Sequence, residues 1–257
     1  MIRFTKYQGK KIELPGQELI VEDALLQEHP LQIIINGEAL SITMQTPGDE
    51  RDLVRGLLFS EDIFRDKNAD LPMEMITNAS GVIDSISVRI DKDKLGNGYA
   101  NSRQLLSVAS CGICGRTAFE GRQGKLSNKP ALELELIPSL FEIMNDHQKL
   151  FEATGGCHAS AAFDIKGKLL AIREDIGRHN AVDKVIGALI HQKQLKEASI
   201  LLVSGRVSYE IVSKCFMAGM PMLAAVSAPS TLAVDFAKEL GIELIAFARG
   251  NKLTVYS

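Results

Sequence analysis

The sequence predicts an α/β protein that has a smaller β-rich α+β domain followed by a three-layer α/β/α domain. From residue 132 onward, apolar runs of strand length alternate with amphipathic helical segments, which is typical of a largely parallel sheet covered by helices. Before residue 91, short apolar runs separated by turn residues indicate a sheet with little helix. We expect the N-terminal domain to span residues 1–109, a mobile connector 110–130 and the C-terminal domain 131–257.

The N-terminal domain contains a predicted hairpin. Residues 31–35 and 40–44 are apolar-rich, and the Asn36-Gly37 dipeptide between them suits a two-residue turn in which both positions need positive φ. Leucine and valine recur at helical spacing over residues 53–58, so one helix should lie against the hairpin. Residues 82–90 alternate apolar and polar side chains, which predicts another strand.

The connector is predicted from its glycine content, because residues 110–124 hold too many glycines for a regular element. After it, Leu132 to Leu136 alternates as a strand, and Leu140, Met144, His147 and Phe151 form one helical stripe. A helix should begin after Asn180, a favourable N-cap, and two more should follow Ser208 and Ser230 and end at Gly219 and Gly241. Strands are expected at residues 161–164, 169–173, 199–203, 222–226, 242–248 and 253–256.

The composition excludes several classes of protein. The chain has 257 residues, of which 46% are hydrophobic and 24% charged, as in ordinary globular proteins. Its net charge of −3 argues against a broadly basic nucleic-acid binder. No apolar stretch approaches the roughly 18 residues of a membrane span, and the first residues lack the apolar region of a secretory signal. We therefore expect a cytoplasmic protein whose four cysteines are reduced thiols.

Three loops of the C-terminal domain each follow a strand and enter a helix. They are residues 173–180, 204–208 and 227–230. Ligands bind at the carboxyl ends of strands in open sheets, and helix N-termini favour phosphate. Arg178 and Arg206 add guanidinium groups. A further loop near the C-terminus, residues 247–252, adds two more cations and an aromatic ring. Taken singly, each arginine could instead pair with Glu174, Asp175 or Glu210, and the serines could simply cap helices.

Together the loops predict a pocket for a phosphorylated, nucleotide-like ligand. Thr154-Gly155-Gly156-Cys157-His158 adds a backbone that allows close approach and a histidine. His158 and His179 are each open to two interpretations, a pocket contact or a hydrogen-bonded core histidine. The predicted pocket residues are Gly155, Gly156, His158, Arg178, His179, Gly205, Arg206, Ser208, Phe247, Ala248, Arg249, Gly250, Asn251 and Lys252.

Cys111-Gly112-Ile113-Cys114-Gly115 is the second chemical signal. One interpretation is half of a zinc site, but a closed site needs four ligands, and only Cys157-His158 offers more. Flanking glycines argue against a thioredoxin-like motif and favour a loop that can swing. Arg116 should favour the thiolate, which suits carrying sulfur as a persulfide. We expect Cys111 and Cys114 to be the reactive pair, with no metal bound.

These motifs resemble the FdhD family, the sulfur carriers required for formate dehydrogenase activity. The resemblance rests on residues 111–115 and 154–159, on Arg-Glu-Asp-Ile-Gly-Arg-His-Asn-Ala-Val-Asp-Lys at 173–184, and on Ser-Gly-Arg-Val-Ser at 204–208. Ala-Val-Ser-Ala-Pro-Ser at 225–230 and Phe-Ala-Arg-Gly-Asn-Lys at 247–252 complete it.

The resemblance implies a function and a set of partners. A cysteine desulfurase would donate sulfur as a persulfide on Cys111, and the protein would act as a sulfurtransferase toward the molybdenum cofactor. That client, in its bis(molybdopterin guanine dinucleotide) form, would then enter formate dehydrogenase. The pocket would hold the guanine dinucleotide part, so that GDP is an expected analogue. The family also implies a cytidine-deaminase-like C-terminal fold and a homodimer.

Two rival functions follow from the same features. A zinc deaminase would need an acidic residue two positions after a histidine. The residues found there are Leu31, Lys149, Ser160, Ala181 and Lys193, so no deaminase activity is expected. The other rival is a non-catalytic chaperone that binds and delivers the molybdenum cofactor without moving sulfur.

Overall fold

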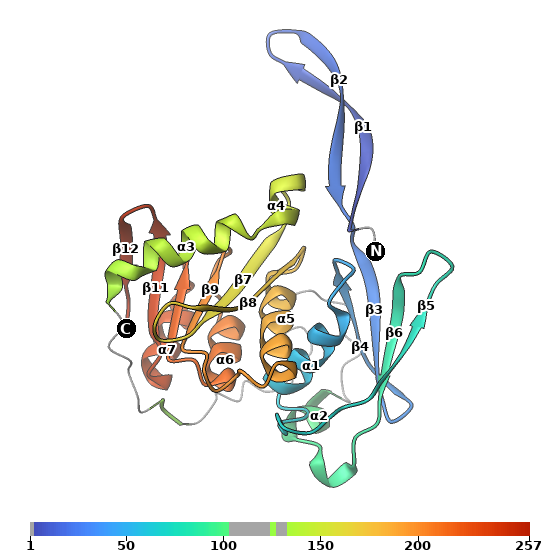
Figure 1. Ribbon diagram of the computed structural model, residues 1–257, viewed down its shortest axis with the longest axis vertical. Helices are drawn as coiled ribbons and strands as arrows, with labels where there is room; N and C mark the ends of the chain where they lie inside the picture. The colour runs from blue at the N-terminus through green and yellow to red at the C-terminus, as the bar shows by residue number, and fades with distance from the viewer. Residues whose placement is uncertain (1–2, 103–123, 127–132) are drawn as a thin grey trace.

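The computed structural model describes residues 3–102, 124–126 and 133–257, and it confirms the α/β fold class (Figure 1). A six-stranded sheet with the order β12-β11-β10-β9-β7-β8 forms the centre of the C-terminal half. Its strands are β7 (His158–Phe163), β8 (Leu169–Asp175), β9 (Ile200–Val203), β10 (Met222–Ala225), β11 (Glu243–Arg249) and β12 (Lys252–Val255).

Helices cover both faces of this sheet. One face packs against α5 (Arg178–His191), α6 (Tyr209–Ala218) and α7 (Thr231–Leu240) in the largest apolar cluster. The other face packs against α3 (Ile137–Asp146), which runs across the sheet in Figure 1. The short helix α4 (Lys149–Thr154) then leads into β7. The three layers arise because alternate residues of each buried strand point to opposite faces.

The sheet is mixed rather than largely parallel. β9, β10 and β11 pair in parallel, as strand–helix alternation predicts. β7 is antiparallel to both β8 and β9, and β12 is antiparallel to β11. The two edge pairs are hairpins with short turns, which permit only antiparallel pairing. As a consequence, β7 begins at the edge of the sheet where β8, β9, β10 and β11 end.

The N-terminal part forms a second sheet with the order β4-β3-β6-β5. The predicted hairpin is β3 (His29–Ile35) with β4 (Glu38–Gln45), and the predicted strand is β6 (Ile83–Val88). β5 (Met73–Thr77) was not anticipated, nor was the separate hairpin of β1 (Phe4–Glu13) and β2 (Gln17–Leu26). Helix α1 (Glu50–Ser60) packs on this sheet as predicted, and α2 (Asn97–Ser102) follows a 3-10 turn at Lys92–Lys94.

Three local predictions were wrong. Leu134–Leu136 is a 3-10 turn that leads into α3 rather than a strand, because Pro138 in the first helical turn suits a helix start. The helical stripe from Leu140 to Phe151, which we expected on one helix, is divided between two helices, α3 and α4. Gly177, not Asn180, is the N-cap of α5. The Asn180 amide instead donates hydrogen bonds to the Met44 carbonyl (2.8 Å) and to Asp175 (3.0 Å).

The two halves are joined through the contact of α1 with α5. A side-chain carbon on Gly56 would overlap the carbonyl oxygen of Asp183, and one on Gly187 would overlap that of Asp52. Only glycine permits this approach of two helix backbones. Buried Lys184 reinforces the contact, since its Nζ lies 2.7 Å from Asp175 and 2.7 Å from the Thr46 carbonyl.

Candidate functional site

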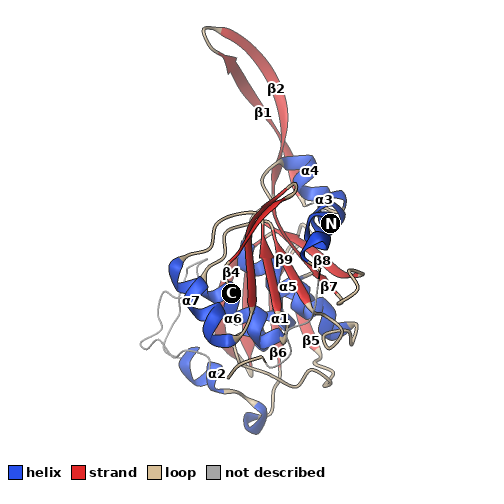
Figure 2. Ribbon diagram, turned by 90° about the vertical axis from the view of Figure 1, so that its left-hand side faces the viewer, coloured by secondary structure: helices blue, strands red, loops and turns tan. Residues whose placement is uncertain are grey.

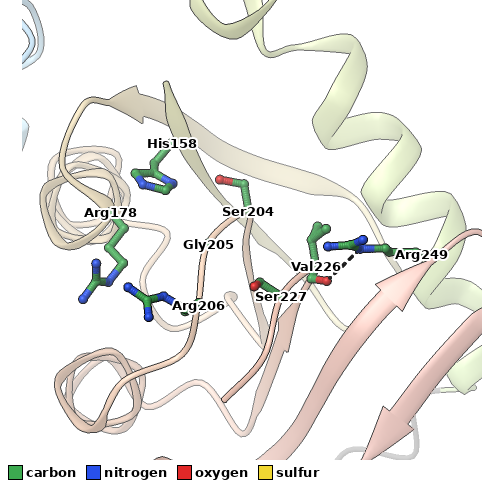
Figure 3. Close-up of a pocket in the computed structure, with 8 residues that line it drawn as sticks. All are labelled: His158, Arg178, Ser204, Gly205, Arg206, Val226, Ser227 and Arg249. Carbon is green, nitrogen blue, oxygen red and sulfur yellow. Dashed lines mark hydrogen bonds between the residues drawn. The ribbon is translucent and has the colours of Figure 1, made fainter. Parts of the chain in front are cut away.

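A pocket of about 350 Å³ opens at the edge of the central sheet where the parallel strands end (Figure 3). Its position follows from the topology, because the loops after β9, β10 and β11 meet the start of β7 and the first turn of α5 there. The residues that line it are His158, Arg178, Ser204, Gly205, Arg206, Val226, Ser227 and Arg249. Five of these, His158, Arg178, Gly205, Arg206 and Arg249, were predicted from the sequence.

Three guanidinium groups surround the pocket. Arg178 and Arg206 lie near each other on one side, and Arg249 lies across the opening (Figure 3). None of the three forms an ion pair with any residue that the structure describes. Nε of Arg178 is buried without a hydrogen-bond acceptor in the described chain, whereas Nε of Arg249 donates to the Val226 carbonyl at 3.4 Å. The pocket therefore concentrates uncompensated positive charge.

The carboxylates that could have neutralised these arginines are engaged elsewhere. Glu174 accepts hydrogen bonds from the backbone N–H groups of Leu150 and Phe151, both at 2.8 Å. Asp175 pairs with Lys184 in the core. Glu210 lies 3.9 Å from His179. The simple explanation in which the arginines serve only local salt bridges does not hold in the described structure.

His158 is held as a neutral imidazole. Burial and the nearby Arg178 guanidinium lower the pKa of His158 below its ordinary value of 6.5, although Asp175 opposes the shift. The ring lies against Gly205, where an added side-chain carbon would be 3.2 Å from Nδ1. A neutral histidine offers one donor and one acceptor nitrogen, so His158 can hydrogen-bond a ligand without adding charge.

Some predicted residues lie beside the pocket rather than in its lining. Nε2 of His179 is 3.2 Å from the hydroxyl of Ser208, which is the N-cap of α6. The first turn of α6 thus faces the same edge and brings its backbone N–H groups there. Gly155 ends α4 with a left-handed backbone, and Gly156 follows it on the surface.

The terminal loop contributes unequally. Arg249 lines the pocket, while Ala248 is buried and Gly250, Asn251 and Lys252 form the exposed turn into β12. Phe247 is 45% exposed and has a φ of 54°, a strained value for a residue with a large side chain. Strain of this kind concentrates at ligand sites.

Three lining residues were missing from the predicted set. Ser204 begins a loop that was predicted to form the pocket, but it was not itself named as a pocket residue; its hydroxyl accepts a hydrogen bond from the Ala159 N–H at 2.9 Å. Val226 and Ser227 follow β10 in the same way. The signal available in the sequence was position alone, since each residue comes within two positions of the end of a strand.

The predicted reactive pair, Cys111 and Cys114, lies outside the described residues. Burial and the Glu174 carboxylate raise the pKa of the Cys157 thiol to about 12. Burial also raises the pKa of Cys215, which lies on the buried face of α6. Among the described residues, no three histidine, cysteine or acidic side chains gather as a metal site. The expectation that no zinc is needed stays a prediction, because the Cys111 motif is not among them.

Fold and site together define an α/β protein with a cationic pocket at the carboxyl edge of its sheet, suited to a phosphorylated ligand. The chain belongs to the FdhD/NarQ family, whose model matches residues 26–257. It is 41% identical over 243 residues to the sulfur carrier protein FdhD of Sulfolobus acidocaldarius, covering 94% of this chain and 92% of that protein. It is also 41% identical to the sulfur carrier protein FdhD of Nocardia farcinica, over 262 residues that cover 95% of this chain and 89% of that one.

A solved structure shows the same fold. It is that of a formate dehydrogenase accessory protein from Desulfotalea psychrophila, with a TM-score of 0.75 and 22% sequence identity. The match covers 100% of this chain and 97% of the other. In the parts of the chain that the structure describes, no helix is both long and apolar enough to cross a membrane.

Proposed function

We propose that this protein is a sulfur carrier that serves formate dehydrogenase by sulfurating its molybdenum cofactor. The relatives named as sulfur carrier proteins support the carrier role, and the formate dehydrogenase accessory protein of the same fold supports the enzyme it serves. The client is a substrate of the carrier, the bis(molybdopterin guanine dinucleotide) form of the cofactor. The cationic pocket is the observation that bears most directly on this proposal.

The pocket suits the nucleotide part of such a client. A guanine diphosphate group brings about two to three negative charges, which three guanidinium groups can pair bidentately. Arg178 offers a buried Nε that lacks an acceptor, so an incoming phosphate oxygen would satisfy a donor already desolvated. The volume of about 350 Å³ is near the lower end for ligand sites, so it would hold one part of the dinucleotide and leave the rest outside.

Individual residues have distinct roles in this proposal. Arg178, Arg206 and Arg249 bind phosphate, and the first turn of α6 after Ser208 adds backbone donors. Neutral His158 provides a hydrogen bond without repelling the arginines. Phe247, exposed beside Arg249, presents an aromatic face on which a planar base can stack.

The sulfur would be carried on Cys111. The Cys111 thiolate attacks the outer sulfur of a persulfide on a cysteine desulfurase, so that a new S–S bond forms while the donor's own S–S bond breaks. The desulfurase cysteine leaves as a thiolate, and no net oxidation occurs. Cys114 assists the onward transfer. This chemistry needs reduced thiols, which the cytoplasm maintains. We also propose that the carrier is a homodimer.

Calorimetric titration with nucleotides tests the pocket. GDP should bind, and Arg206→Ala or Arg249→Ala should weaken binding by about tenfold, since a charged hydrogen bond contributes roughly 1.5–3 kcal/mol. Arg89→Ala is the matched control, because Arg89 is exposed and lies outside the pocket. ADP should bind more weakly, because a guanine site leaves groups unpaired with adenine. Equal affinity for both would reduce the site to a general phosphate pocket, and no binding of either would overturn the cofactor assignment.

A further inference from the structure

The turn between β8 and α5 carries Arg178 into the pocket. Asp175 ends β8 and Arg178 begins α5, so the turn between them consists of Ile176 and Gly177. The side chain of Arg178 lies near that of Arg206 in the pocket (Figure 3). Two guanidinium groups at one place repel each other until an anion binds, so the backbone that carries Arg178 must be held firmly.

The end of β4, in the N-terminal part of the chain, holds this turn. The β1–β2 hairpin projects away from the body (Figures 1 and 2), and the two parts of the protein meet mainly where α1 packs on α5. The hydroxyl of Thr46, the residue after β4, accepts a hydrogen bond from the N–H of Ile176 at 3.0 Å. The N–H of Thr46 donates to the Asp175 carboxylate at 3.1 Å. Thr46 therefore bonds to the turn at two points.

Asn180 makes a second link to β4 from the first turn of α5. Its amide nitrogen donates to the Met44 carbonyl at 2.8 Å, and its amide oxygen accepts from the Thr43 hydroxyl at 3.2 Å. The same nitrogen donates to Asp175 at 3.0 Å. We call Thr46, Asp175 and Asn180 the turn anchor.

The turn anchor is buried. Thr46 and Asp175 are fully buried, and Asn180 is 8% exposed. Lys184, which is also buried, balances the charge of Asp175, because its Nζ lies 2.7 Å from that carboxylate. Pro47 favours an extended backbone at Thr46. A buried network of paired polar groups is rigid, since any shift leaves one of them without a partner.

Gly177 packs tightly against the turn anchor. A side-chain carbon at this position would be 3.0 Å from Nδ2 of Asn180 and 3.3 Å from the Asp175 carboxylate. The φ of Gly177 is −95°, which any residue can adopt, so it is packing that leaves no room for a side chain. Arg178 follows directly, and its Nε is buried with no acceptor among the described residues. Close packing thus continues from β4 through the turn to Arg178.

We propose that Thr46 and Asn180 are positioning residues that set Arg178 in place for phosphate, so that anion binding in the C-terminal half depends on the N-terminal part of the chain. Neither residue is among those that line the pocket, and each acts through the turn. The inference rests on the proposed phosphate-binding role of Arg178, but it needs neither guanine recognition nor sulfur transfer. Loss of the Thr46 hydroxyl frees the turn and moves the guanidinium group away from the phosphate.

The test is calorimetric titration of the full chain with GDP and with pyrophosphate. Thr46→Val removes the hydroxyl but keeps the shape and the backbone bonds of the residue, and it should weaken binding of both ligands about fivefold. Thr46→Ser keeps the hydroxyl and should restore most of the affinity. Ser60→Ala is the matched control, because the buried Ser60 hydroxyl also links the two parts of the protein, through Asp183 at 2.7 Å, away from the turn. It should lower the melting temperature and leave the affinity unchanged.

A double-mutant cycle separates positioning from a general loosening of the protein. In the Arg178→Ala protein, Thr46→Val should change the affinity less than about twofold, because the group that it positions is gone. In the Arg206→Ala protein, the same change should still weaken binding about fivefold. Gly177→Ala, which crowds the turn anchor from the other side, should show the same dependence on Arg178.

Proton exchange at Nε of Arg178, followed by NMR in the ligand-free protein, gives a second readout. Burial should protect this proton, and Thr46→Val should speed its exchange with water whereas Ser60→Ala should not. Arg178→Lys identifies the signal by its loss.

The outcomes separate this inference from the proposed function. GDP binding that is unaffected by Thr46→Val, or weakened equally by Thr46→Val, Thr46→Ser and Ser60→Ala, would overturn the positioning role and leave the pocket standing. An effect of Thr46→Val that persists in the Arg178→Ala protein would do the same. Binding of pyrophosphate but not GDP, with the expected cycle, would support positioning and remove the guanine assignment. Binding of neither ligand would overturn both the pocket and the positioning role.

Discussion

Gly205 lies so close to His158 that a side-chain carbon added to it would sit 3.2 Å from Nδ1 of the imidazole. The contact places the ring at one wall of the pocket and leaves room for the backbone after β9. It also makes the ring's position depend on a residue from a different strand. The pocket is thereby assembled from parts that are 47 positions apart in the chain, at residues 158 and 205.

Gly205→Ala should weaken GDP binding by about tenfold, because overpacking a fitted site costs about 1 kcal/mol or more. The methyl group would push the His158 ring toward the ligand. In a protein that already carries His158→Ala, the alanine at position 205 has no ring to push. Gly205→Ala should therefore reduce GDP affinity little in that background. Calorimetry on the four proteins of this double-mutant cycle checks the coupling. Additive losses would show that the two residues act independently.

Protonation of His158 should increase the affinity for nucleotide as the pH falls from about 7.5 to 5.5. In the free protein, burial and Arg178 lower the pKa of His158 below 6.5, so the ring is neutral at the upper end of this pH range. A bound polyphosphate favours the imidazolium and raises that pKa, so binding takes up a proton between the two values.

The terminal phosphate of the nucleotide also takes up a proton in this pH range, and the loss of its negative charge lowers the affinity as the pH falls. The His158→Gln protein retains this effect of the nucleotide but lacks the effect of the histidine. The difference between the pH profiles of the two proteins therefore measures the contribution of the His158 ring. Identical pH profiles for the two proteins would contradict a pocket role for His158.

Replacing Lys214 by methionine should destabilise the fold by about 3–5 kcal/mol, because it leaves a buried carboxylate unpaired. Lys214 is 4% exposed, and its Nζ lies 2.9 Å from both carboxylate oxygens of Asp183 and 2.8 Å from Glu61. Burial raises the pKa of Asp183, although Lys214 and Ser60 oppose it. Denaturant unfolding of the full chain measures the loss.

A second variant separates charge from packing at this site. Asp183→Leu with Lys214→Met removes both charges and should be less harmful than the sum of the single changes. Lys6→Met, at the exposed Lys6–Glu22 pair of the β1–β2 hairpin, should change stability little. If the double variant were as unstable as the sum, the loss would come from packing and not from an unpaired charge.

Cys157 and Cys215 should resist alkylation in the folded protein. The Cys157 thiol is buried and has a pKa of about 12, so little thiolate exists at neutral pH. Peptide mapping after brief iodoacetamide treatment should find label on Cys111 and Cys114 instead. Full labelling appears once the protein is denatured. Rapid modification of Cys157 before denaturation would make it a candidate for sulfur transfer and would contradict its assignment as a core residue.

Much of the fold was predictable because buried strands and helices carry strong apolar periodicity. The hairpin of β3 and β4 follows from its Asn-Gly turn, and the capping residues Ser208 and Ser230 begin α6 and α7 as expected. The β1–β2 hairpin was not predictable, since its residues are mostly exposed and charged side chains interrupt its apolar ones. The close contact of Gly56 with α5 was likewise hidden, because it depends on two segments distant in sequence.

The candidate site was predictable where strand ends carry arginine or glycine. Arg178, Arg206 and Arg249 were recognisable because each lies at the end of a strand or shortly after it. Ser208 and His179 lie beside the lining of the pocket and not in it, since helix orientation decides which residue of a loop faces the opening. In the sequence, Ser204 and Ser227 cannot be distinguished from serines of any surface loop. Ser204 lies next to His158 only because β7 pairs antiparallel with β9.

The most direct test of the proposed function is the intact mass of the protein after incubation with a cysteine desulfurase and cysteine. The unmodified chain and Cys114→Ala should each gain one sulfur atom, about 32 Da, which a thiol reductant removes. Cys111→Ala should gain none while still binding GDP. An equal adduct on Cys111→Ala would place the sulfur elsewhere. No adduct on the unmodified chain, together with normal activation of formate dehydrogenase by Cys111→Ala, would make the protein a chaperone of the molybdenum cofactor and contradict its role as a sulfur carrier.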